Sequence, residues 1–175
     1  MVDLIGDTIG GFEFANKIDG KIFYQIKIAV KRQSGKYDIL TLLTEKQVLG
    51  RIKVTGELRS RQYHNTLRLY VYAKKIEKTN ECHYNDVFIK GVVEKEPIYR
   101  MTPKGREITD ILLKTDRGNV SDHIPCIIWG KTHLKKGSRV RLGGRLQSRE
   151  YTKKYTDRTE TKTAYELSVR AYEIY

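Results

Sequence analysis

The sequence predicts an all-β protein built from two tandem five-stranded barrels. Short segments in which apolar and polar residues alternate, with the period of two that a β-strand has, follow one another along the chain. Turn-forming residues separate these segments at short intervals, and no helical periodicity persists over a long window. An eight-residue pattern, G-x-L-x-S-R-x-Y, occurs at residues 56–63 and again at 144–151, after similar alternating segments. The repeat indicates an internal duplication.

The first half of the chain contains five segments with strand patterns. In the second of them Ile26, Ile28 and Val30 lie on one face and Lys27 and Lys31 on the other, as in a half-buried strand. Turns are expected at residues 16–21, 33–36 and 64–65, and residues 44–50 leave room for barely two turns of helix. The expected strands are residues 1–14, 23–32, 38–43, 51–63 and 66–76.

The second half repeats the series. Residues 102–105 place Pro second and Gly fourth, which a type I turn prefers. A polar loop is expected at 117–122 and a long polar hairpin at 152–162. The expected strands are residues 86–93, 107–115, 123–129, 139–151 and 163–174. With a short polar linker at 77–84, the modules are residues 1–79 and 84–175.

The two halves align at two offsets. The repeated pattern lies 88 residues apart, whereas the earlier strands align at an offset of 85. On that alignment Asp38 stands where His123 stands, and Thr44 where Trp129 stands. Ten strands in two sets of five predict two OB-folds, the five-stranded Greek-key barrel of this size.

Composition limits the class of protein. Of the 175 residues, 39% are hydrophobic and 31% charged, which is typical of a globular chain. No apolar run approaches the roughly 20 residues that a spanning helix needs, and the N-terminus lacks a signal-peptide pattern. Two cysteines make no disulfide framework. We therefore expect a cytoplasmic protein with no membrane partner.

The net charge of +13 is spread over both halves. Residues 1–80 contain 15 Lys and Arg against 8 Asp and Glu, and the rest contains 19 against 13. A basic balance on two folded modules indicates a polyanionic partner such as nucleic acid. The alternative is a surface with excess lysine and no such partner.

Five short motifs follow one another in the second half. They are D-V-F-I-K-G at 86–91, Y-R-M-T-P-K-G at 99–105, D-H-I-P-C-I-I-W-G-K at 122–131, K-K-G-S at 135–138 and G-R-L-Q-S-R-E-Y at 144–151. In this order they resemble bacterial single-stranded DNA-binding proteins. The whole chain resembles the tandem-OB variant of Gram-positive bacteria and mobile elements. The resemblance implies sequence-tolerant binding of single-stranded DNA, without catalysis and without a cofactor.

The chain departs from that family in two places. Family members usually carry a longer helix between W-G-K and K-K-G-S, where only residues 132–134 stand here. Connecting helices are therefore expected to be shortened or missing. Members also commonly end in a flexible acidic tail that recruits partners, whereas this sequence ends in a predicted strand. We expect no acidic C-terminal recruitment tail.

Binding of single strands needs cations along the backbone and flat rings on which bases stack. In the third strand of the second half, His123 and Trp129 share a face, and the resemblance places both at DNA-facing positions. Lys131 stands beside them in the sequence. The alternatives are a core tryptophan and a plain surface histidine.

The fourth strand adds a second row of candidates. Tyr151 matches a family stacking position, and Arg149 is expected to contact phosphate or a base. The hairpin that follows is interpreted as a basic arm, or alternatively as a solvated charged loop. The nucleic-acid candidates of the second half besides His123, Trp129 and Lys131 are Arg117, Arg145, Gln147, Arg149, Tyr151, Lys153, Lys154 and Tyr155.

The first half repeats part of this theme with Arg59, Arg61 and Tyr63, which are also candidates. It is otherwise a degenerate module, which we expect to bind weakly and to serve mainly in assembly. Its other aromatic residues could be core or interface residues as easily as stacking platforms. They are Phe23, Tyr24, Tyr70 and Tyr72.

No catalytic motif is present, so we expect no enzyme. A metal site is not expected either, because His123 and Cys126 point to opposite faces of a strand. A nuclease would need clustered carboxylates, but Glu94, Glu96, Asp110 and Asp122 are scattered over different elements. The expected partner is single-stranded DNA, with RNA, a homodimer and a monomer all left open. The alternative function is an OB module that docks on a replication or transfer protein.

Overall fold

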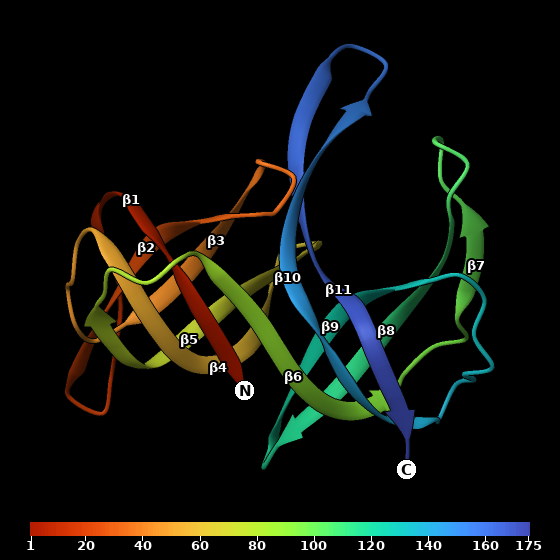
Figure 1. Ribbon diagram of the computed structural model, residues 1–175, viewed down its shortest axis with the longest axis horizontal. Coiled ribbons are helices and arrows are strands. Elements are labelled where there is room, and N and C mark those ends of the chain that lie inside the picture. The colour runs from red at the N-terminus through yellow and green to blue at the C-terminus, as the bar shows by residue number, and fades with distance from the viewer.

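The computed structural model describes residues 1–175 and contains strands but no helix. Figure 1 shows the strands wound into two neighbouring barrels. The strands are β1 (Val2–Ile18), β2 (Lys21–Lys31), β3 (Tyr37–Thr44), β4 (Arg51–Tyr63), β5 (Thr66–Lys78), β6 (Tyr84–Val93), β7 (Ile98–Met101), β8 (Glu107–Arg117), β9 (Val120–Trp129), β10 (Arg139–Lys154) and β11 (Thr159–Ile174).

Each barrel closes by the same pairings. In barrel 1, formed by β1 to β5, the order β2-β3-β5-β4-β1 is closed by a β1–β2 pairing. In barrel 2, formed by β6 to β11, the order β6-β10-β11-β9-β8 is closed by a β6–β8 pairing, and β7 adds to β8. The β3–β5 and β9–β11 pairs are parallel and the others antiparallel. The predicted fold of two tandem OB barrels without connecting helices is confirmed.

Several element predictions were wrong in detail. The structure has eleven strands instead of ten, because β7 pairs with β8 just before the turn at 102–105. Residues 117–122 are not a loop: Arg117 pairs with Val120, and only two residues turn the chain. The polar hairpin at 152–162 is also mostly strand. All three segments are exposed or polar on both faces, so the apolar alternation that reveals a half-buried strand is missing from them.

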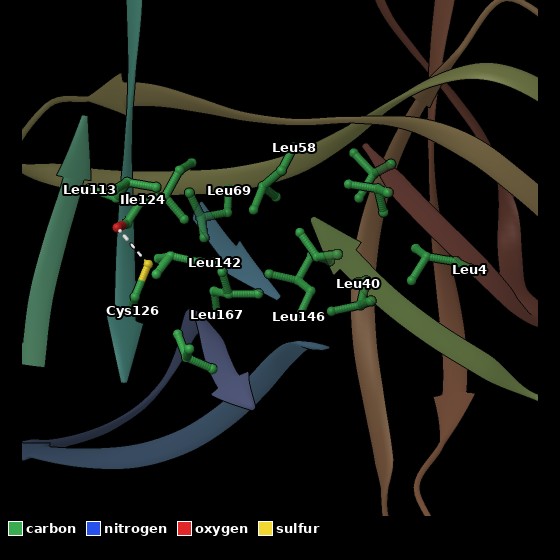
Figure 2. Packing of buried hydrophobic residues seen from close by; sticks show 14 of the residues in the cluster. Leu4, Leu40, Leu58, Leu69, Leu113, Ile124, Cys126, Leu142, Leu146 and Leu167 are labelled. Atoms are coloured by element: carbon green, nitrogen blue, oxygen red, sulfur yellow. Dashed lines mark hydrogen bonds between the residues drawn. The ribbon is translucent and has the colours of Figure 1, made fainter. Parts of the chain in front are cut away.

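A continuous hydrophobic core joins the barrels. It contains 26 buried residues, among them Leu4 and Leu40 in barrel 1 and Leu113 and Leu142 in barrel 2. Leu58 and Leu146, the leucines of the repeated pattern, lie between these two groups, as Figure 2 shows. Burying such a side chain contributes about 1.5–3 kcal/mol. The barrels therefore pack as one body and not as two beads on a linker.

The barrels are related by an approximate two-fold axis. Strands β1 and β6 pair antiparallel, with Val2 opposite Val87. Val2 is also the partner of Gly56 in β4, and Val87 the partner of Gly144 in β10. Two equivalent residues therefore face each other, which is the arrangement of a two-fold symmetric interface between identical subunits.

The sequence alignment of the third strands was wrong by one residue. Asp38 corresponds to Asp122 and not to His123. Both aspartates are buried, and each accepts hydrogen bonds from an arginine a few residues earlier in the chain, Arg32 and Arg117 respectively. The hairpin before β9 is one residue shorter than the hairpin before β3, so the offset falls from 85 to 84. Thr44, which is buried, therefore does not take the place of Trp129; that place belongs to Glu45.

Candidate nucleic-acid interface

The outer face of barrel 2 consists of the sides of β9, β10 and β11 that point away from the core. Arg145 lies opposite Ser168, and Ser168 lies beside Ile127, so these residues share a face with Trp129, two positions further along β9. Trp129 is 48% exposed, and its indole Nε1–H donates a hydrogen bond of 3.3 Å to Ser168 Oγ. The interpretation of Trp129 as a core residue is wrong.

A hollow of about 370 Å³ lies beside this ring. Arg145 from β10 and Arg170 and Tyr172 from β11 line it together with Trp129. The guanidinium of Arg106 lies 5.9 Å from the centroid of the tryptophan ring, which is within cation–π range. A flat, cation-bordered recess of this kind fits a stacked base and its phosphate.

Strand β10 presents a second ring. Tyr151 is 39% exposed, and the guanidinium of Arg149 lies 6.0 Å from its ring centroid. Gln147, which was expected beside them on the surface, is instead buried, and its amide donates a 2.7 Å hydrogen bond to Glu166. Glu166 also lies 3.5 Å from Arg149 Nε. Gln147 and Glu166 therefore form the floor of the outer face.

Arg145 contacts residues of both barrels. Its guanidinium lies 3.5 Å from the carboxylate of Asp38 in barrel 1 and donates to Gln147 Oε1 at 3.0 Å. Burial, and then the positive charge of Arg32, lower the pKa of Arg145. An arginine nevertheless stays protonated in a folded protein. Part of its charge is therefore already neutralised before any ligand arrives.

Three other candidates already have partners. His123 Nδ1 lies 2.8 Å from Glu94 Oε2, and Arg117 Nε donates to the buried Asp122 at 2.5 Å. The ammonium of Lys131 lies 4.9 Å from the ring centroid of Tyr99, which is within cation–π range. Arg117 is accordingly placed as an ion-pair partner of Asp122.

The β10–β11 hairpin projects as a long two-stranded arm at the top of Figure 1. Near its tip Tyr155 is surrounded by Lys153, Arg158 and Lys162, whose charged groups lie 4.8–5.5 Å from the ring centroid. Lys162 also donates a 2.9 Å hydrogen bond to the Tyr155 hydroxyl, and this bond lowers the pKa of the phenol. Lys154 is exposed beside this group. The arm therefore concentrates positive charge around an aromatic ring.

The candidates of the first repeat lie on β4, in barrel 1. Arg59 is held over the ring of Tyr72, 5.4 Å from its centroid, and pairs with Glu57. Tyr63 is 50% exposed at the β4–β5 turn with Arg68 over its ring, and Arg61 is exposed. The structure therefore does not join these residues to Trp129 in a single row.

Four residues around this face escaped the sequence analysis as candidates. Arg170 and Tyr172 of β11 line the hollow beside Trp129. Arg106 and Tyr99 flank the turn between β7 and β8 and border Trp129 and Lys131 respectively. Tyr99 lay inside a quoted motif, but nothing in the sequence showed that β7 folds back along β8. Only the pairing of these strands reveals it.

The structure holds no cluster of three or more His, Cys, Asp or Glu side chains that could bind a metal ion. Asp110 pairs with Arg100, Glu94 contacts His123, and Asp122 bonds to Arg117. Three of the four carboxylates that a nuclease would gather around a metal are thus engaged separately. No helix of the length and apolarity needed to cross a bilayer occurs.

Comparison with known proteins identifies the family of the chain. The model of the single-strand binding protein family matches residues 84–175. A single-stranded DNA-binding protein of Clostridium tetani is 32% identical over 83 residues, covering 40% of this chain and 57% of that protein. One from Bacillus cereus is 35% identical over 80 residues, covering 38% of this chain and 47% of its own. The matched part thus spans about half the length of these relatives.

The wild-type single-stranded DNA-binding protein from Thermus aquaticus has a similar structure over almost the whole chain. The TM-score is 0.71 with 19% sequence identity, and the similarity covers 99% of this chain and 91% of that one. At this level of identity the similarity concerns the fold. This similarity of fold covers both barrels.

Proposed function

Because the chain belongs to the single-strand binding protein family, whose model matches residues 84–175, we propose that it binds single-stranded DNA without reading its sequence. Barrel 2 is the principal site. The chain performs no catalysis in this role and serves DNA replication, recombination or the transfer of a mobile element. We propose residues 1–79 and 84–175 as its two modules.

The observation that carries this proposal is the pair of exposed rings, Trp129 and Tyr151, on one face of barrel 2 with guanidinium groups beside each. Stacking of a base on such a ring contributes about 1–3 kcal/mol and is independent of sequence, since every base has a π-face. Arg149 and Arg106 replace counterions along the phosphates, which makes binding weaken as the salt concentration rises.

The remaining candidates have graded roles. Lys153, Lys154 and Tyr155 on the arm extend the cationic path beyond Tyr151, and Lys131 borders the β7–β8 turn. His123 contributes at the edge of the face, where Glu94 shares its ring nitrogen. Arg145 and Arg149 each lie 3.5 Å from a buried carboxylate, that of Asp38 and that of Glu166, but Arg149 is the more exposed of the two and is therefore the stronger phosphate contact. The proposal does not distinguish DNA from RNA, since stacking and charge are common to both.

The test is a titration of the Trp129→Ala, Tyr151→Ala double variant with a short oligo-dT. Loss of two stacking platforms should weaken binding about 30-fold or more, from about 1–3 kcal/mol per base. Tyr84→Ala, which removes a tyrosine that is 51% exposed next to β1, is the control and should bind like the unaltered protein. An unchanged affinity in the double variant would refute the proposal.

A further inference from the structure

We propose that barrel 1 carries a second track for single-stranded nucleic acid, with Tyr70 and Tyr72 of β5 as its stacking platform. The inference rests on the proposed function of barrel 2. It differs from the expectation that the first module is degenerate and serves mainly in assembly. The platform lies on β5, whereas Trp129 of barrel 2 lies on β9, which corresponds to β3. Aligning β3 with β9 therefore does not reveal it.

The two-fold relation of the barrels shows which residues correspond. A Cβ added to Gly56 would lie 2.1 Å from the carbonyl oxygen of Tyr72, and one added to Gly144 would lie 2.2 Å from that of Ser168. Both glycines follow a bulge at the same place in the ladder. Tyr72 therefore takes the place of Ser168, the residue to which the Trp129 indole is bonded.

The exposed aromatic side chains lie on different strands in the two barrels. At the position of Trp129 barrel 1 has Glu45, which pairs with Lys21 at 3.2 Å. The neighbouring strand supplies the aromatic side chains instead, since Tyr72 lies beside Leu43 of β3. Barrel 1 thus has an aromatic residue on its outer face, on the strand next to the one that corresponds to β9.

The tyrosines are partly exposed and lie among cations. Arg59 is opposite Tyr70 in the β4–β5 ladder, and its guanidinium lies over the ring of Tyr72. The ring of Phe23, which is buried, lies 5.8 Å from that of Tyr72 and supports it. Burial, and then the charge of Asp122, raise the pKa of Tyr70, so this phenol stays neutral near DNA.

The carboxylate next to the tyrosines is neutralised. Glu57, opposite Tyr72, pairs with both Arg59 and Lys74. An incoming phosphate therefore has to compete with Glu57 for these cations. Barrel 1 should accordingly bind more weakly than barrel 2 while using the same chemistry.

The arm of barrel 2 reaches this second face. Tyr165 of β11 lies beneath the ammonium of Lys27, 5.7 Å from it, and Lys27 donates a 2.6 Å hydrogen bond to Thr41 on the outer side of β3. Ser148, the ladder partner of Tyr165, accepts a hydrogen bond from the backbone of Ile39. The base of the arm thus lies against barrel 1 through the side of the hairpin opposite to Arg149 and Tyr151. In this inference the DNA passes around the arm from the face of barrel 2 to the face of barrel 1.

The experiment measures the number of nucleotides that each chain covers on poly-dT. Trp129 is the sole tryptophan, so quenching of its fluorescence follows saturation. The Tyr70→Ala, Tyr72→Ala variant should cover about half as many nucleotides as the unaltered chain. It should bind a 30-mer at least fivefold more weakly, since one OB fold covers about 4–16 nucleotides. Its affinity for an 8-mer should be unchanged, because barrel 2 binds this oligomer alone.

Two further variants keep the result interpretable. Tyr70→Phe with Tyr72→Phe retains the rings and should behave like the unaltered protein. Tyr70→Leu with Tyr72→Leu removes the rings but retains apolar volume, so that packing is disturbed less than by alanine. This variant should show the same reduced coverage and the same weaker binding of the 30-mer as the alanine variant. Unchanged coverage and 30-mer affinity in the leucine variant would overturn the inference. Failure of the proposed function has a different signature, since the 8-mer would then bind normally to the Trp129→Ala, Tyr151→Ala variant. Because this variant lacks the sole tryptophan, its binding is followed by the fluorescence anisotropy of a labelled 8-mer.

Discussion

The backbone N–H of Ser148 donates a 2.9 Å hydrogen bond to the carboxylate of Asp38, which lies on the other barrel 110 residues earlier in the chain. The hydroxyl of Ser148 in turn accepts a bond of 2.9 Å from the backbone N–H of Ile39. The same arrangement recurs across the two-fold axis. Ser60 N–H donates to Asp122 at 2.7 Å, and the Ser60 hydroxyl accepts from the backbone of His123 at 2.8 Å.

Ser60 and Ser148 are the same position of the repeated pattern, so the repeat itself builds the contact between the barrels. Asp38 and Asp122 are buried, and each also pairs with an arginine of its own barrel. A buried carboxylate without such partners would be strongly destabilising. Each barrel therefore has a buried aspartate whose carboxylate accepts a hydrogen bond from a serine backbone N–H of the other barrel.

Replacing either serine by alanine should lower the free energy of unfolding by about 1 kcal/mol or slightly more. The change removes one hydrogen bond and leaves a partly buried backbone N–H at the contact between the barrels without its acceptor. Because the geometry is reciprocal, Ser60→Ala and Ser148→Ala should cost similar amounts. Denaturant unfolding measures this, with the exposed turn residue Ser34→Ala as the control. Equal stability of all three variants would contradict the assigned role.

Gly144→Ala should be markedly destabilising, whereas Gly143→Ala, one residue away, should be tolerated. The added Cβ at Gly144 would lie 2.2 Å from the backbone oxygen of Ser168, but at Gly143 the nearest atom is 3.9 Å away. Overpacking against backbone typically costs about 1–3 kcal/mol. Thermal unfolding of the two variants gives the comparison. Similar midpoints would show that β10 and β11 can separate locally without cost.

The free energy of unfolding should fall as the pH drops below about 6.5 because of His83. Burial, and then the charge of Arg51, lower the pKa of this imidazole from its usual 6.5, while Asp7 opposes the shift. The unfolded chain therefore binds the proton more readily, so this contribution is complete above pH 6.5 and is lost on acidification. His83 Nδ1 accepts a 3.2 Å bond from the backbone of Lys31, and Tyr37 also contacts its ring.

Denaturant unfolding between pH 7.5 and pH 5 measures this loss. His83→Gln is the reference, since other groups titrate equally in both proteins. The difference in stability between the two should shrink on acidification. Parallel pH profiles would exclude His83 as the source.

One of the two thiols should react with Ellman's reagent in the folded protein, and both should react after denaturation. Cys82 is exposed, whereas Cys126 is buried and its thiol lies 3.3 Å from the carbonyl oxygen of Ile124. Burial raises the pKa of Cys126 far above its ordinary range, so the reactive thiolate does not form. Cys82→Ser should abolish the fast reaction. Rapid modification of both thiols would mean that barrel 2 opens readily.

Glu166→Gln should strengthen binding of oligo-dT about threefold at low salt. The substitution keeps an acceptor for Gln147 and removes the negative charge that lies 3.5 Å from Arg149. Arg149 would then be free to pair with phosphate. Glu173→Gln is the matched control, because it breaks another Arg–Glu pair of β10 and β11, with Arg141. An equal effect of both substitutions would point to net charge alone and not to the proposed face.

The sequence by itself determined the all-β class, the duplication and most strand positions. These properties depend on local alternation and on the repeated pattern, both of which are legible along the chain. It also placed Trp129 and Tyr151 on outward-facing positions, because side chains alternate along a strand. The single-strand binding family was accessible through motifs that lie within 84–175.

Only the tertiary structure decided which candidates are free to meet a ligand. Strand parity places Gln147 beside Arg149, but Glu166 from β11 buries it. Arg117 and Arg145 have the charge that DNA requires, yet buried aspartates pair with them. The partners in question lie 5 to 107 residues away in the chain. Such contacts depend on how strands pair and how the barrels face each other, and no local pattern encodes either.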